Sequence, residues 1–256
     1  MAYRPFDLTG KVALVTGGNR GIGLGIARAV AEAGADIAIW GTNAAKNAEA
    51  QADLEQTGRK VLALQCDVGD EAAVEAAFAR TIEAMGRVDG CFANAGIGGG
   101  AKSFLEMTSE QWHRVLRVNL DGAFYTFRAA ARNMVERGGD GVLVGTASLA
   151  AIEGSPRSEH YAATKGGLIS MVRALAVEFA RYNVRAHAIL PGWIDTDMTQ
   201  RLTTNETFHG KVMPRIPMRR WGRGDDFGGI AVYLMSSAAR YHTGDTFIID
   251  GGYSLF

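Results

Sequence analysis

One serine, one tyrosine and one lysine in the second half of the chain have a spacing that could support proton transfer. Ser148 lies thirteen residues before Tyr161, and Lys165 follows Tyr161 by four residues. If Tyr161 and Lys165 share a helix, this spacing places both side chains on one face. A neighbouring ammonium favours the phenolate, so we expect the pKa of Tyr161 to fall from about 10 toward neutral pH. Such a phenol can exchange a proton with a substrate oxygen, which Ser148 could hold.

A glycine-rich segment near the start of the chain could bind the redox partner that this chemistry needs. Residues 16–23 read TGGNRGIG and lie between an apolar run typical of a buried strand and a stretch with helical periodicity. Gly17 permits a tight turn, Gly21 lets the backbone approach a pyrophosphate, and Gly23 allows the helix to pack on the strand. The helix N-terminus favours an anion. The segment therefore predicts a dinucleotide site; the alternative is a turn with a structural role alone.

The end of the second predicted strand indicates which nicotinamide cofactor is bound. NAD-binding proteins usually carry a carboxylate there, whereas residues 40–43 read WGTN. Arg20, inside the glycine-rich segment, could bind a 2′-phosphate, helped by Thr42, Asn43 and Lys46. The alternative for the two cations is a solvated helix face. We predict NADP(H) in preference to NAD(H).

Strand-like and helix-like segments alternate along the chain, which is typical of parallel βαβ units. No linker or change in composition divides the 256 residues, so we expect a single domain over residues 1–256. The predicted fold is an α/β Rossmann fold, with a doubly wound parallel sheet of about seven strands flanked by helices. Residues 193–223 are polar and irregular, and we interpret them as a substrate loop. Strands are predicted at 11–16, 36–40, 60–65, 88–93, 141–146, 184–190 and 246–249, and the later helices at 43–58, 70–86, 109–137, 159–182 and 225–239.

The composition argues against several other classes of protein. The formal net charge is zero, so bulk charge attracts neither nucleic acid nor an anionic membrane. No apolar run is long enough for a membrane span, and we expect a cytoplasmic protein. Cys66 and Cys91 lie in apolar runs without Cys/His clustering, so we expect buried free thiols in a reducing compartment and no metal site.

Several motifs together resemble the classical short-chain dehydrogenase/reductase family. The similarity runs from about Thr9 to Ser254, nearly the whole chain, and the order and spacing of the motifs are more specific than any one of them. The resemblance implies an NAD(P)(H)-dependent oxidoreductase that interconverts a ketone and a secondary alcohol. The motifs are TGGNRGIG, Asn94-Ala95-Gly96, Asn119 in RVNLDG, Ser148 and YAATK at 161–165, with Asp67, Pro191-Gly192 followed by Thr196, and the terminal DGG.

The resemblance also implies roles for single residues. Tyr161 would be the acid/base, and Lys165 would lower its pKa and touch the nicotinamide ribose. Ser148 would orient the substrate oxygen, and Asn119 would hold a water in a proton relay behind Lys165; the alternative for Asn119 is a capping or kink residue. Asp67 and Val68 would flank the adenine, Asn94 to Gly96 would line the cleft, and Ile194 and Thr196 would contact the carboxamide. The predicted cofactor contacts are Gly17, Asn19, Arg20, Gly21, Ile22, Gly23, Thr42, Asp67, Val68, Asn94, Ala95, Gly96, Tyr161, Lys165, Pro191, Gly192, Ile194 and Thr196.

Two other functions stay open at this point, besides a general ketone or alcohol enzyme. One is a 3-oxoacyl thioester reductase, and the other is a non-catalytic NADP-binding regulator that kept the fold. The substrate is expected to be a small molecule selected by residues 98–102, 150–157 and 193–220, with Glu153 and Trp193 as candidate contacts. The resemblance further implies a homotetramer built from the helices at 109–137 and 159–182 and from the C-terminal segment up to Phe256.

Overall fold

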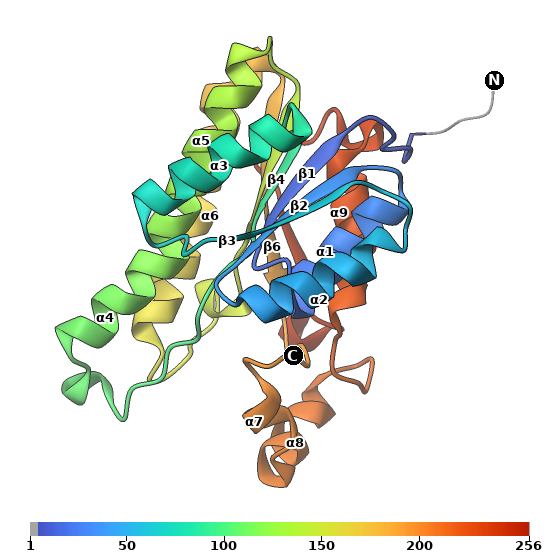
Figure 1. Cartoon of the computed structure of the whole chain (residues 1–256). Coiled ribbons are helices and arrows are strands. Elements are labelled where there is room, and N and C mark those ends of the chain that lie inside the picture. The colour runs from blue at the N-terminus through green and yellow to red at the C-terminus, as the bar shows by residue number, and fades with distance from the viewer. Residues whose placement is uncertain (1–4, 256) are drawn as a thin grey trace.

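The computed structural model describes residues 5–255, so Phe256 lies outside the described part of the chain. Its strands form one parallel sheet (Figure 1) in the order β3-β2-β1-β4-β5-β6-β7. The order reverses between β1 and β4, and loops that follow those two strands therefore diverge at the sheet's carboxyl edge, where open α/β sheets bind ligands. The strands are β1 Val12–Thr16, β2 Asp36–Gly41, β3 Val61–Gln65, β4 Gly90–Ala93, β5 Gly141–Thr146, β6 Val184–Pro191 and β7 Thr246–Ile249.

Helices cover both faces of the sheet (Figure 1), which confirms the predicted doubly wound architecture. Helices α1, α2 and α9 lie on one face, and α3, α5 and α6 lie on the other. The α-helices are α1 Gly21–Glu32, α2 Ala44–Glu55, α3 Glu71–Met85, α4 Ser109–Leu116, α5 Gly122–Glu136, α6 Glu159–Phe179, α7 Gln200–Thr203, α8 Glu206–Val212 and α9 Gly228–Met235.

The strands alternate between two hydrophobic cores. Leu14 and Trp40 belong to the core under α3, α5 and α6, whereas Val15 and Ile39 belong to the core under α1, α2 and α9. All four side chains are fully buried. Because both faces of a parallel sheet are covered, its strands are almost continuously apolar, which is why the sequence placed all seven strands to within two residues at each end.

The helices differ more from the sequence-based expectation. Asp70 is the N-cap of α3, as predicted, and accepts hydrogen bonds from the backbone N–H of Ala72 and Ala73 at 2.9 and 3.2 Å. The helix predicted at 109–137 is instead α4 and α5, joined by a π-helical turn at Arg117–Asp121. The segment predicted as a helix at 225–239 consists of α9 between two 3-10 turns, Gly224–Phe227 and Ser237–Ala239. Apolar periodicity does not resolve such local changes of helical pitch.

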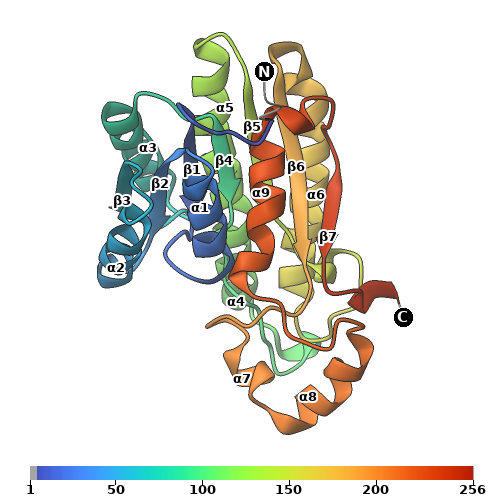
Figure 2. The same cartoon turned by 90° about the vertical axis from the view of Figure 1, so that its right-hand side faces the viewer.

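The substrate loop, residues 193–223, is not irregular throughout, contrary to the prediction. It contains α7 and α8, which lie beyond the carboxyl edge of the sheet (Figure 2). An aromatic cluster supports it: the Trp193 ring packs edge-on against Phe208 at a centroid distance of 4.9 Å and against Tyr253 at 6.3 Å. The loop is therefore packed, on a small hydrophobic core that it shares with Leu149 and Tyr253.

The entrance and exit of the substrate loop are fastened to each other. The N–H of Asp195 donates to the carbonyl of Gly222 at 2.8 Å, and the N–H of Gly222 donates to the carbonyl of Trp193 at 3.0 Å. Just beyond, the chain runs backbone to backbone along α1. A Cβ on Gly25 would lie 2.2 Å from the Gly224 carbonyl oxygen, and one on Gly224 would lie 2.3 Å from that of Gly21. Real side chains would force these segments apart.

Candidate active site

A cleft of about 470 Å³ opens at the carboxyl edge, where the strand order reverses. Its walls come from the ends of β1, β2, β4, β5 and β6, and from the first turns of α1 and α2. Of the predicted catalytic and cofactor-binding residues, all but Gly23 and Asn119 line the cleft. The topology therefore brings together residues that are up to 179 positions apart, from Gly17 to Thr196.

Ser148, Tyr161 and Lys165 converge at one end of this cleft. Tyr161 and Lys165 lie one turn apart on α6, as predicted, and Ser148 follows β5 and accepts a hydrogen bond from Ala150 N–H at 3.2 Å. The side chains of Ser148 and Tyr161 are hydrogen-bonded to each other. Lys165 is 4% exposed, and its Nζ donates to the carbonyl of Thr146 at 2.7 Å. The end of β5 thus fixes both partners of the phenol.

The electrostatics of the phenol differ from the sequence-based expectation. Burial raises the pKa of Tyr161 above its ordinary value, although the hydrogen bond from Ser148 acts in the opposite direction. The Lys165 Nζ lies 5.5 Å from the centroid of the Tyr161 ring and donates to Thr146. Burial also lowers the pKa of Lys165 to about 8. Desolvation therefore outweighs the predicted attraction between phenolate and ammonium, and the phenol is protonated at neutral pH.

Asn119 lies behind Lys165, in the π-helical turn, and is 1% exposed. Its Oδ1 accepts from Ile97 N–H at 2.8 Å, and its Nδ2 donates to the Ile97 carbonyl at 3.0 Å. A Cβ on Gly96 would lie 3.3 Å from Asn119 Oδ1 and 3.6 Å from Lys165 Nζ, so the three residues border one small space. Asn119 thus fixes the loop after β4 next to the lysine.

The side chain of Asn94 fastens three strand ends together. Its Nδ2 donates to the Thr16 carbonyl at 3.0 Å, and its Oδ1 accepts from Thr146 Oγ1 at 3.2 Å. Thr16 Oγ1 also accepts from the N–H groups of Asn94 and Ala95, both at 3.0 Å. These bonds hold β1, β4 and β5 at the positions where their loops form the cleft wall.

The glycine-rich segment fits a dinucleotide pyrophosphate. Helix α1 begins at Gly21; its N-cap residue, Arg20, makes no side-chain cap hydrogen bond, and its first turn holds no acidic residue. The first N–H groups of a helix need acceptors, and an anion is a natural one. Packing is tight on the protein side, since a Cβ on Gly23 would lie 2.3 Å from the Gly17 carbonyl oxygen. Asn19 shapes the segment through a 2.7 Å hydrogen bond from its Nδ2 to Asn47 Oδ1.

Two cations and one carboxylate meet at the other end of the cleft. Asp197 Oδ2 accepts from Arg20 Nη1 at 2.7 Å and from Lys46 Nζ at 2.8 Å. All three side chains are between 41% and 57% exposed. Thr42 lines the cleft there, at the end of β2, and Asn43 caps α2 by accepting from Lys46 N–H at 3.0 Å. The cations predicted to bind a 2′-phosphate are thus adjacent, but they already share an anion.

The remaining predicted contacts form the floor and rim of the cleft. Asp67 accepts from Gly69 N–H and from Arg117 Nη1, both at 3.0 Å, so an ion pair borders the predicted adenine position. Thr196 closes over the glycine-rich segment, since a Cβ on Gly21 would lie 3.1 Å from its Cγ2. Val68, Pro191, Gly192 and Ile194 also line the cleft.

Sequence reasoning missed several residues that line the cleft. Asp197 is the most important, and no local pattern marks it, because its partners lie 177 and 151 positions away. Trp193 and Glu153, both proposed as substrate contacts, do not line the cleft, and Trp193 belongs to the aromatic cluster under the substrate loop. The other lining residues that were not predicted are Trp40, Gly41, Cys66, Ile97, Val118, Thr146, Ala147, Met198 and Thr199.

Three further observations concern the two cysteines, possible metal sites and possible membrane-spanning helices. Cys66 and Cys91 are buried free thiols, as predicted, and burial raises the pKa of the Cys66 thiol to about 11. Within residues 5–255, no group of His, Cys, Asp and Glu side chains could hold a metal ion. No helix in the same part of the chain combines the length and the apolar character that crossing a membrane requires.

Comparisons with known proteins show which family the chain resembles over nearly its whole length. A family model described as "Enoyl-(Acyl carrier protein) reductase" matches residues 17–254. The chain is 40% identical over 250 residues to a 2-dehydro-3-deoxy-D-gluconate 5-dehydrogenase of Pseudoalteromonas atlantica, with 97% of each protein covered. It is 36% identical over 246 residues to a 3-oxoacyl-(acyl-carrier-protein) reductase of Chlamydia trachomatis, covering 96% of this chain and 98% of the relative.

A solved structure extends the likeness to three dimensions. The gluconate 5-dehydrogenase from Burkholderia cenocepacia, in complex with NADP and tartrate, is 34% identical and has a TM-score of 0.93. The superposition covers 99% of this chain and 98% of that one.

Proposed function

Because the chain belongs to the classical short-chain dehydrogenase/reductase family, we propose that Tyr161 is its acid/base, assisted by Ser148, Lys165 and Asn119. The chain is an NAD(P)-dependent oxidoreductase that acts on CH–OH groups and interconverts ketones and secondary alcohols. The observation that supports the residue roles is the convergence of Ser148, Tyr161 and Lys165 at one end of the cleft.

The proposed mechanism follows from the protonation state of the phenol. The cleft residues would hold a reduced nicotinamide, which when bound would supply a hydride to the carbonyl carbon of the substrate. The Tyr161 hydroxyl gives its proton to the carbonyl oxygen, and the Ser148 hydroxyl donates a hydrogen bond to the same oxygen as negative charge develops there. In the oxidative direction the tyrosinate takes the proton of the alcohol. The raised pKa of Tyr161 keeps the phenol protonated at neutral pH, which is the form that donates the proton in ketone reduction.

Lys165 and Asn119 position this chemistry. The Lys165 ammonium, held by the Thr146 carbonyl, stabilises the tyrosinate that forms in each cycle. Asn119 holds the Ile97 backbone, and with Gly96 and Lys165 it borders a space through which a water could return a proton to the lysine. The role of Asn119 in such a relay is part of the proposal.

NADP(H) is the proposed cofactor, in preference to NAD(H). Arg20 and Lys46 supply two cations beside Thr42, at a strand end whose described residues offer no carboxylate of their own. The Burkholderia cenocepacia enzyme was solved with NADP, which supports the same choice. The predicted cofactor contacts from Gly17 to Thr196 would hold it along the cleft.

The substrate is proposed to be a small ketone or secondary alcohol, with sugar acids as the first candidates, because two of the relatives are named for gluconate derivatives. The second candidate is a 3-oxoacyl thioester, supported by the similarity to the Chlamydia trachomatis reductase. Residues 193–223, the substrate loop, would make the choice, since lids beside a cleft often select substrates.

A substrate panel would test this function. Oxidised sugar acids, acetoacetyl thioesters and cyclic ketones would be incubated with NADPH or NADH, and absorbance of the reduced cofactor would be followed. We expect turnover of at least one class and its loss in Tyr161→Phe. Cofactor binding without turnover of any ketone or alcohol, in either direction, would instead favour the regulator alternative.

A homotetramer in the cytoplasm is proposed as the working form. Apolar side chains exposed on α5, α6 and β7 support association, namely Phe124 at 44%, Val177 at 83% and Ile248 at 44% exposure. The two buried free thiols support a reducing compartment. Light scattering of the purified protein would measure the number of subunits directly.

A further inference from the structure

Asp197 stands where the proposed cofactor would place an anion. One carboxylate oxygen, Oδ2, accepts from Arg20 Nη1 at 2.7 Å and from Lys46 Nζ at 2.8 Å. A single oxygen shared by a guanidinium and an ammonium is an arrangement that a phosphate oxygen reproduces closely. The same two cations are the ones that we propose for the 2′-phosphate of NADP(H).

The carboxylate and a 2′-phosphate would compete for these cations. Hydrogen bonds from Lys46 and Arg20 hold the pKa of Asp197 below its usual range, so its side chain is an anion at neutral pH. With Asp197 in place, the cluster carries one net positive charge. A phosphate monoester carries a charge of about −1.5 to −2 at neutral pH. The three side chains and the phosphate together would therefore carry a net negative charge. The Asp197 carboxylate and the phosphate would repel each other while both lie beside Arg20 and Lys46.

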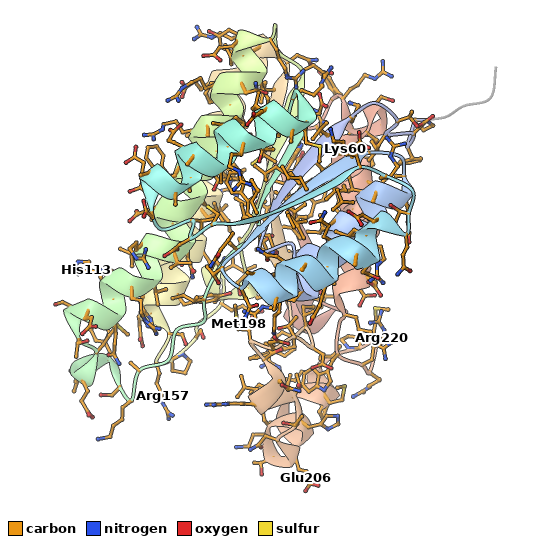
Figure 3. The ribbon with its side chains drawn as sticks, viewed as in Figure 1. Lys60, His113, Arg157, Met198, Glu206 and Arg220 are labelled. Atoms are coloured by element: carbon orange, nitrogen blue, oxygen red, sulfur yellow. The ribbon has the colours of Figure 1, made fainter. Side chains whose placement is uncertain are left out.

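Because Asp197 is part of the substrate loop, displacing its carboxylate would also move that part of the loop. The root of this loop is fixed, because Ile194 is 4% exposed and Asp195 N–H is bonded to Gly222. Its tip, Asp197 and Met198, is about half exposed, and Figure 3 shows Met198 between the sheet and the helices of the substrate loop. A Cβ on Gly98 would lie 3.5 Å from Met198 Cγ, so the tip reaches from the cations to the loop after β4.

We propose that Asp197 is a cofactor-discriminating residue, and that it acts as an internal substitute for the 2′-phosphate. A cofactor without this phosphate leaves Asp197 paired with Arg20 and Lys46, so the tip stays closed. A cofactor with it displaces the carboxylate and releases the tip. Asp197 thereby weakens NADP(H) binding and keeps NAD(H) usable. This inference rests on the proposed function, since it assumes that the cleft binds the adenosine half of a nicotinamide dinucleotide.

Calorimetric titration with cofactor fragments would test the proposal without using activity. Adenosine 2′,5′-bisphosphate carries the 2′-phosphate, and adenosine 5′-monophosphate lacks it. In Asp197→Asn we expect the Kd of the bisphosphate to fall about tenfold, because one repulsive charge is removed from an exposed site. The Kd of the monophosphate should stay unchanged. Asp195→Asn is the matched control, since Asp195 is on the same exposed loop but pairs with Thr203, and neither Kd should change.

The other outcomes separate the inference from the proposed function. If wild type binds the bisphosphate but Asp197→Asn binds it no more tightly, or gains equally for both fragments, Asp197 does not discriminate. If wild type binds neither fragment, the proposed cofactor site itself is wrong. Asp197→Ser gives the same test should the first variant misfold. Trypsin cleavage after the exposed Arg201 supplies a second readout: NADP should accelerate it more than NAD in wild type, and this difference should vanish in Asp197→Asn.

Discussion

The two ends of the cleft are built on opposite physical principles. At the reacting end Lys165 and Asn119 are at most 4% exposed. Lys165 donates to the main-chain carbonyl of Thr146, and Asn119 bonds both main-chain groups of Ile97 and the hydroxyl of Thr164. At the other end, where we propose that the adenosine half of the cofactor binds, Arg20, Lys46 and Asp197 are 41% to 57% exposed and are held together by ion pairs. Buried, backbone-fixed groups keep one geometry, whereas exposed ion pairs are weak and exchange partners readily. The groups that we propose for proton transfer are therefore held in one geometry, whereas the groups that we propose for cofactor selection can rearrange.

The largest effect should come from removing the phenol oxygen. In Tyr161→Phe we expect kcat to fall by about a thousandfold or more, because general acid catalysis typically contributes between 10² and 10⁴. Affinity for NADPH, measured by fluorescence titration, should remain that of wild type. Ser148→Ala, which keeps the phenol, serves as the comparison and should lose less. Near-normal turnover in Tyr161→Phe would show that Tyr161 is not the acid/base and that the buried end of the cleft does not perform the proton transfer.

Lys165→Met should separate activity from stability. The pKa of Lys165 is about 8 in the folded protein, against 10.5 for an ordinary lysine. Below pH 8 the folded state holds a disfavoured charge, and this penalty fades as the pH rises from about 8 to 10.5. The free energy of unfolding of wild type should therefore rise relative to the variant across that window, by up to about 3 kcal/mol.

Urea unfolding of both proteins between pH 7 and pH 10.5 would measure this difference. Comparing the two proteins cancels the other groups that titrate in the same range, such as Cys66. Losing the bond to the Thr146 carbonyl lowers stability by about 1 kcal/mol at every pH, so the slope, not the offset, is diagnostic. Turnover should fall although the fold persists. A stability difference that does not change with pH would show that Lys165 is not desolvated as described.

The smallest effect belongs to the exposed end. Thr42→Asp places a carboxylate at the end of β2, where it repels a 2′-phosphate and can accept from ribose hydroxyls. We expect NADPH affinity to fall about tenfold at low salt and NADH affinity to rise, with the difference shrinking at high ionic strength. Thr42→Asn is the neutral control. Unchanged NADPH affinity would show that this strand end does not face the phosphate.

The neighbouring position cannot be used for the same purpose. A Cβ on Gly41 would lie 2.3 Å from Asn19 Nδ2 and 2.5 Å from Asn47 Oδ1. A side chain there would break the hydrogen bond between these two asparagines, which shapes the glycine-rich segment. Affinity for both cofactors should then fall together in Gly41→Asp, in contrast to the opposite changes expected at Thr42.

The difference between the two ends of the cleft also explains which site residues could be predicted from the sequence. Tyr161 and Lys165 are recognisable because one helix fixes their spacing, and the apolar strands place Ser148 and Asn94 at one edge. The sequence does not show how far the surrounding protein shields the phenol from water, so it predicted a lowered pKa for Tyr161 where the structure raises it. The ion pairs of Asp197 could not be predicted from the sequence, because only the folding of the loop brings this residue to partners that lie 177 and 151 positions away.

The two backbone hydrogen bonds that join Trp193 and Asp195 to Gly222 have a consequence for how the substrate loop can vary between related enzymes. Since the two ends of the substrate loop are hydrogen-bonded to each other, insertions or deletions among the exposed residues between them leave the spacing of those ends unchanged. Related enzymes can therefore exchange these exposed residues while Ser148, Tyr161 and Lys165 keep their positions. The exchange must stop before Gly224, where a side chain would pry the chain away from α1 and so disturb the glycine-rich segment. The molecule thus has a natural graft boundary for redesign, at residues 195 and 222.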